Sequence, residues 1–141
     1  TYILGNASFT VVCPDRRYDY EEENNRSLGI RLTDSSHSFL ILGDAQSKSE
    51  SAMLNENLDL SADVYMVSHH GSASSSTEKF LRAVHPAFAV ISVGADNDYG
   101  HPAQKTLSRL EAQDIQILRT DLSGTITAYS TPDTLTWSTG R

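Results

Sequence analysis

The order of apolar segments along the chain is the strongest constraint on its fold. Between residues 39 and 118, short runs of β-branched and aromatic residues alternate with stretches whose apolar residues recur at helical spacing. On either side of this region, such runs follow one another at the spacing of β-hairpins. This order predicts a mixed sheet with helices on one side, within an α/β (α+β) fold.

The expected elements are short. Strands are predicted at residues 2–4, 9–13, 28–32, 39–42, 64–67, 88–93, 115–118, 125–129 and 134–137. Helices are predicted at residues 47–58, 76–84 and 102–113. Residues 64–67 and 88–93 are almost uninterrupted apolar runs, which is typical of central strands. Residues 18–26 include three consecutive glutamates and predict a solvated connection.

Composition narrows the function. With 141 residues, the chain is sized for one domain or a fragment, residues 1–141, and its 38% of hydrophobic residues suffices for a core. A net charge of −7 argues against a surface that binds nucleic acid through general positive charge. The single cysteine, Cys13, excludes an internal disulfide and a zinc site built from thiolates.

Three groups of polar residues each follow a predicted central strand. They are Asp44 after residues 39–42, the pair His69 and His70 after residues 64–67, and His101 after residues 88–93. In open sheets with helical crossovers, ligand sites lie beyond the carboxyl ends of the strands, so we expect these side chains to converge. His37 and His85 lack such a setting and are interpreted as ordinary surface or core residues.

A carboxylate beside imidazoles predicts a metal site, because this ligand set suits zinc, manganese or iron. Successive residues that leave a strand point in different directions, so one of His69 and His70 is expected to bind metal while the other faces substrate. Asp44 is the candidate for a carboxylate that bridges two ions, with an N-cap of the helix at residues 47–58 as the alternative. About four ligand groups are too few for two ions, which predicts half a site.

Several motifs together resemble the C-terminal metallo-β-lactamase-fold domain of ComEC-type competence proteins, a bacterial family of DNA-internalisation channels. The motifs lie at residues 24–28, 39–44, 62–64, 68–72, 89–94, 99–102, 119–121 and 124–126, so the resemblance covers most of the chain. It implies the C-terminal part of an αββα sandwich, with a site for two divalent ions, zinc or manganese, at the edge of two facing sheets. The ligand cluster H-x-[HD]-x-D-H of the wider fold is absent from the chain, so the fragment is expected to be inactive alone.

The resemblance also implies roles for single residues. The metal ligands would be Asp44, His70 and His101, with Asp44 as the bridging carboxylate. The catalytic residues would be His69 and His70. The groups that face the substrate phosphate would be Asn25, Ser72 and His69. Asn24 or Asn25 stands where many relatives of the wider fold have a histidine.

By the same resemblance, the chain is part of a metal-dependent phosphodiesterase or nuclease that takes part in bacterial DNA uptake. Its partners would be DNA and a membrane channel portion of the same polypeptide, upstream of this chain. It would form a soluble domain at the outer face of the cytoplasmic membrane. Two alternatives remain: a catalytically silent structural or docking domain of the same fold, and a hydrolase of small esters.

Overall fold

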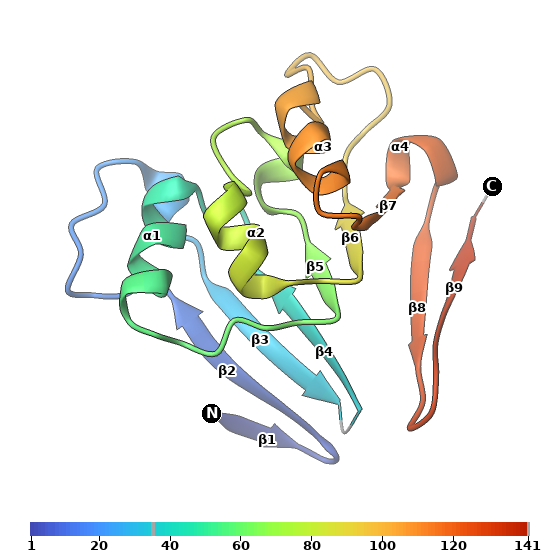
Figure 1. Cartoon of the computed structure of the whole chain (residues 1–141), viewed down its shortest axis with the longest axis horizontal. Helices are drawn as coiled ribbons and strands as arrows, with labels where there is room; N and C mark the ends of the chain where they lie inside the picture. The colour runs from blue at the N-terminus through green and yellow to red at the C-terminus, as the bar shows by residue number, and fades with distance from the viewer. Residues whose placement is uncertain (35, 141) are drawn as a thin grey trace.

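A seven-stranded mixed sheet is the main feature of the computed structural model, which describes residues 1–34 and 36–140. The strands lie in chain order: β1 (Tyr2–Leu4), β2 (Ala7–Cys13), β3 (Gly29–Asp34), β4 (His37–Ile41), β5 (Val64–Met66), β6 (Phe88–Ile91) and β7 (Gln116–Arg119). Neighbouring strands from β1 to β4 are antiparallel, and those from β4 to β7 are parallel (Figure 1). The predicted α+β class and mixed sheet are confirmed, while the two-sheet sandwich stays a prediction.

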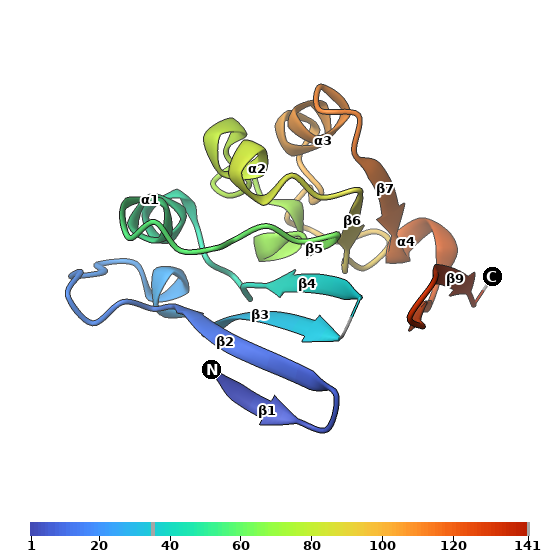
Figure 2. The same ribbon diagram turned by 60° about the horizontal axis from the view of Figure 1, so that its bottom comes forward.

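The helices connect the parallel strands. They are α1 (Ser47–Asn55), α2 (Glu78–Val84), α3 (Gln104–Glu111) and the short α4 (Thr120–Ser123), with 3-10 turns η1 (Glu23–Arg26) and η2 (Ser68–Gly71). Each predicted helix is present but shorter than expected, and α4 was not predicted. Helices α1, α2 and α3 all lie on one face of the sheet, as predicted (Figure 2). No helix in residues 1–34 and 36–140 is long and apolar enough to cross a membrane.

The core lies between this helical layer and the sheet. Leu40, Tyr65 and Ala89 pair across β4, β5 and β6, and all three are fully buried. Phe80 and Leu81 of α2 belong to the same buried cluster, and the Tyr65 and Phe80 rings meet edge to face. Burying a large apolar side chain contributes roughly 1.5–3 kcal/mol. The packing therefore fixes the three strands whose carboxyl ends carry the candidate site.

The opposite face of the sheet is also apolar. Because side chains alternate along a strand, the register places two rows on this face: Phe9, Leu32, Phe39, Val64 and Phe88, and Val11, Ile30, Ile41, Met66 and Val90. A hairpin of β8 (Ile126–Ser130) and β9 (Leu135–Thr139) contacts one end, where Trp137 meets Phe88 with ring centroids 5.1 Å apart. Most of these residues are only half-buried. No helix of the described residues covers them (Figure 2).

The prediction of a solvated connection at residues 18–26 was wrong for two residues. Tyr20 and Asn25 are only 4% and 2% exposed. The Tyr20 hydroxyl accepts a hydrogen bond from the Asp15 backbone N–H, and Asn25 is bonded to the start of α1. The glutamates around them do remain exposed, which is what their charge dictates.

Candidate metal site at the carboxyl edge of the sheet

Asn25 supplies the cap of α1. Its Oδ1 accepts hydrogen bonds from the backbone N–H of Gln46 at 3.1 Å and of Ser49 at 3.2 Å. Backbone N–H groups at the start of a helix lack acceptors within the helix. The buried Asn25 side chain provides that acceptor in place of a side chain at the N-cap position itself. The structure thus turns Asn25 inward, away from the phosphate-facing position that the resemblance implied.

Asp44 is therefore free of the capping role left open by the sequence. The N-cap position of α1 is Gln46, and Asp44 makes no side-chain cap there. The Asp44 backbone N–H is held by Ser27 Oγ at 3.2 Å, while its side chain is 45% exposed. The carboxylate is thus available at the end of β4.

The two histidines form a tight turn directly after β5. Both have left-handed backbone conformations, with φ of 51° for His69 and 54° for His70. The His69 N–H donates to the Gly43 carbonyl at 3.0 Å, and the Ala103 N–H donates to the Gly71 carbonyl at 2.9 Å. The turn is thereby bonded to the loop that carries Asp44 and to the segment that follows His101.

The two ring nitrogens of His70 differ in their hydrogen bonding. Its Nδ1 lies 2.7 Å from the Ser92 carbonyl oxygen, which can only accept, so Nδ1 carries the proton. The other nitrogen, Nε2, lies 3.7 Å from Asp44 Oδ1. In the neutral ring Nε2 then has a free lone pair. A backbone carbonyl on the far nitrogen is the usual arrangement of a metal-binding histidine.

His69 is held differently. Its ring lies between two side-chain amides, with Gln46 Nε2 3.4 Å from Nδ1 and Asn24 Nδ2 3.5 Å from Nε2. It faces the His101 ring edge to face, with centroids 5.6 Å apart. Asn24, unlike Asn25, thus lies at the candidate site, and no sequence motif separated the two.

His101 completes the group of imidazoles. Burial lowers its pKa, the charges of His69 and His70 lower it further, and Asp44 opposes the shift. The neutral form, which can bind metal, is thereby favoured. The sequence prediction that Asp44, His69, His70 and His101 converge holds, because all four line one hollow of about 230 Å³.

Ser72 does not line this hollow. Its Oγ lies 3.0 Å from Ser74 Oγ, and its carbonyl accepts a hydrogen bond from Thr106 Oγ1. The following residues are fixed by Glu50, whose buried carboxylate accepts hydrogen bonds from Thr77 N at 3.0 Å and Oγ1 at 2.7 Å. The serine-rich loop is therefore a rigid support for the turn rather than a wall of the hollow.

The donor types fit a divalent ion, since carboxylate oxygen and imidazole nitrogen suit zinc and manganese. The fixed tautomer of His70 and its approach to Asp44 fit the same interpretation. Within residues 1–34 and 36–140, however, no three His, Cys, Asp or Glu side chains are close enough to hold an ion together. The residues present therefore fit one part of a metal site.

Known proteins match the chain over most of its length. ComE operon protein 3 of Bacillus subtilis is 38% identical over 123 residues, which are 87% of this chain and 16% of that protein. Competence protein ComA of Neisseria gonorrhoeae is 35% identical over 84% of this chain and 17% of its own length. Recombination protein 2 of Haemophilus influenzae is 33% identical over 74% of this chain and 13% of its own length. The chain is homologous to one segment of these proteins. It spans about a sixth of their length, and no protein-family model matches it.

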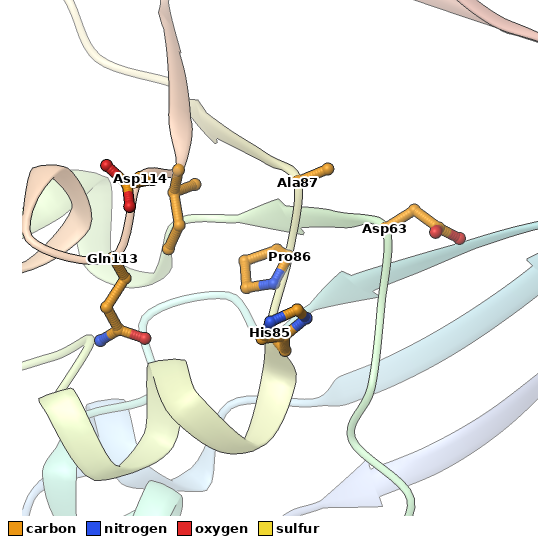
Figure 3. Close-up of a pocket in the computed structure, with 7 residues that line it drawn as sticks. Asp63, His85, Pro86, Ala87, Gln113 and Asp114 are labelled. Atoms are coloured by element: carbon orange, nitrogen blue, oxygen red, sulfur yellow. The ribbon is translucent and has the colours of Figure 1, made fainter.

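A larger hollow, of about 350 Å³, lies at the opposite edge of the sheet. It is formed where the chain enters β5, β6 and β7, and its polar side chains include Asp63, His85 and Asp114. The Asp63 carboxylate is already bonded to the Ser38 backbone N–H and hydroxyl. In Figure 3 the side chains of Asp63, Gln113 and Asp114 point in different directions, so size alone does not make this hollow a site.

Proposed function

We propose that this chain is the metal-binding half of a DNA-cleaving, metallo-β-lactamase-like domain in a bacterial DNA-uptake protein. The observation that carries the proposal is His70, whose Nδ1 is bonded to a carbonyl and whose Nε2 lies 3.7 Å from Asp44. The homologues include a protein named for competence, which supports the role in DNA uptake. The proposed activity belongs to the longer polypeptide, next to its membrane channel portion.

The chemistry follows from the groups around the hollow. Asp44, His70 and His101 would hold the ions, zinc or manganese. A bound divalent ion lowers the pKa of its water to about 7 and polarises a phosphoryl oxygen. His69, oriented by the amides of Asn24 and Gln46, would face the phosphate. An imidazole there can donate a proton to the leaving oxygen.

The uncovered face of the sheet is the surface on which the rest of the domain would pack. It carries two rows of apolar side chains, of which Val11 is 43% exposed. The homologues are about six times as long as the segment they share with this chain, so the proposed occupant is another segment of the same polypeptide. That segment would also supply the remaining ligands, and the chain alone is not expected to cleave DNA.

A chimera tests the proposal. This chain replaces the homologous segment of the Bacillus subtilis protein, and cleavage of linear DNA by the purified chimera is measured with Mn²⁺. We expect cleavage that Asp44→Ala and His70→Ala each reduce by about 100-fold or more, as loss of a central catalytic group does. The matched control is His85→Ala, an exposed histidine at the opposite edge of the sheet, which should cleave at the original rate. Full cleavage by the Asp44→Ala chimera would overturn the assignment.

A second candidate is a catalytically silent docking domain, which is favoured because no three donor side chains among the described residues are close enough to hold an ion together. The transformation frequency of a Bacillus subtilis strain that carries the chimera separates the two candidates. A docking domain should support DNA uptake equally well with Asp44→Ala and His70→Ala. A cleaving domain should lose uptake in both variants and retain it in His85→Ala.

A further inference from the structure

An exposed tyrosine stands at the rim of the candidate metal site. Tyr99 is 83% exposed, and its ring stacks on the His101 imidazole with centroids 5.8 Å apart and planes inclined by 23°. Single exposed aromatic residues are common on protein surfaces, so exposure alone assigns no role. The position of Tyr99 is different because its neighbours belong to the site.

Asn97 holds the loop that carries this tyrosine. Its Oδ1 accepts hydrogen bonds from the backbone N–H of Tyr99 at 3.2 Å and of His101 at 3.0 Å. Its Nδ2 donates to the carbonyls of Gly94 at 3.1 Å and His101 at 2.7 Å. One side chain thus joins four backbone groups of the loop, so the ring of Tyr99 is presented at a fixed place without being buried.

Tyr99 lines two adjoining hollows of different character. One, of about 230 Å³, also contains Asp44, His69 and His70. The other, of about 190 Å³, is bounded by Val93 and Gly94 and shares His70 and His101 with the first. Each is smaller than the roughly 300 Å³ at which pockets for drug-sized ligands begin. Tyr99 therefore borders both a hollow lined by Asp44 and imidazoles and a hollow lined in part by Val93 and Gly94.

The charge around the loop favours recognition through the ring. Asp96 and Asp98 are exposed on either side of Asn97, and the whole chain carries a net charge of −7. These carboxylates repel phosphate, so the loop cannot attract a nucleic acid by charge. A tyrosine face has no net charge and stacks on any base, because every base has a π-face.

We propose that Tyr99 stacks on an unpaired base of the strand whose phosphate enters the hollow lined by Asp44 and His70. The inference rests on the proposed function and adds the substrate class: single-stranded or frayed nucleic acid, since a base must leave the duplex before an aromatic ring can stack on its face. Asn97 is a positioning residue in this scheme, because its hydrogen bonds fix the loop that presents Tyr99.

Binding of two short oligonucleotides tests the inference. Fluorescence anisotropy is measured with a labelled oligothymidylate and with an abasic oligonucleotide of equal length, in Mn²⁺, with both checked to be intact. The proteins are the full chain and its Tyr99→Ala, Tyr99→Phe and Tyr129→Ala variants. Tyr129 is the matched control, a tyrosine 55% exposed on β8 of the hairpin.

We expect Tyr99→Ala to weaken binding of oligothymidylate by about 5- to 140-fold, the equivalent of the roughly 1–3 kcal/mol of one stacked base. Its affinity for the abasic strand should not change, and Tyr99→Phe and Tyr129→Ala should behave as the original chain. If Tyr99→Ala weakens the binding of both strands equally, or of neither strand, stacking is refuted while DNA binding by the chain stands. If the original chain binds neither strand, the inference fails, whereas the proposed function is decided by DNA cleavage in the chimera.

Discussion

Gly71→Ala measures how closely the His69–His70 turn packs against the segment that carries His101. Gly71 has a φ of +83°, a conformation that side chains disfavour. A Cβ placed there would lie 2.7 Å from Pro102 Cβ and 3.1 Å from Pro102 Cα, with Ile91 Cγ2 at 3.5 Å. An alanine therefore meets both an unfavourable backbone conformation and the atoms of a rigid ring.

Two other glycines separate these two effects. Gly100 has a φ of +66° with no atom within 4 Å of a Cβ, and Gly94 has neither a positive φ nor a close neighbour. A left-handed conformation costs a side chain about 1–2 kcal/mol, and overpacking adds about 1–3 kcal/mol. The free energy of unfolding should thus fall by about 2–5 kcal/mol in Gly71→Ala and about 1–2 kcal/mol in Gly100→Ala. For Gly94→Ala the change should stay within about 0.5 kcal/mol.

Urea denaturation followed by far-ultraviolet circular dichroism is the assay. With a slope of about 2 kcal/mol per molar urea, the midpoint of Gly71→Ala should fall by about 1–2.5 M. The urea midpoint should be highest for Gly94→Ala, lower for Gly100→Ala and lowest for Gly71→Ala. If Gly71→Ala and Gly100→Ala unfold together, the close contact with Pro102 is absent and the account of the turn is wrong.

Two further predictions concern groups buried behind the site. Asn25→Ala leaves the backbone N–H groups of Gln46 and Ser49, at the start of α1, without their acceptor. It should lower the free energy of unfolding by about 1–3 kcal/mol in the same assay, whereas Asn55→Ala, at an exposed position, should change it little. Equal stabilities of the two variants would refute the capping role. Burial raises the pKa of Glu50, against hydrogen bonds from Thr77 and the charge of Arg109. The protonated Glu50 side chain therefore contributes most to the free energy of unfolding at low pH. The stability of the original chain relative to Glu50→Gln should fall as the pH rises above the ordinary glutamate pKa of about 4.3. A relative stability that grows with pH would show that the pKa is lowered.

Much of the fold could be predicted because its signals are periodic. The apolar runs at residues 64–67 and 88–93 could hardly be anything but central strands, and both are β-strands, each ending slightly early. The convergence of Asp44, His70 and His101 could be predicted for the same reason, since parallel strands end at one edge. Neither prediction needed a side-chain contact.

What could not be predicted depends on contacts between distant segments. Whether Asp44 caps α1 was decided by Asn25, which reaches the helix from a loop about 20 residues earlier and carries no signal of burial. Which nitrogen of His70 keeps a free lone pair was decided by the Ser92 carbonyl, a backbone group that no sequence motif marks. Tyr99 was seen only as part of a motif, because its place at the rim depends on the hydrogen bonds of Asn97.

Calorimetric titration of the 141-residue chain with Mn²⁺ and Zn²⁺ tests the central claim most directly. The variants are Asp44→Ala and His70→Ala, with His85→Ala as the control at the far edge of the sheet. We predict measurable binding of metal by the original chain. The affinity should fall by at least about tenfold in both site variants, since loss of even a residue that only supports a ligand lowers metal affinity by that factor. The affinity should be unchanged in His85→Ala. No binding by the original chain, or equal binding by all four proteins, would contradict a metal site at Asp44 and His70.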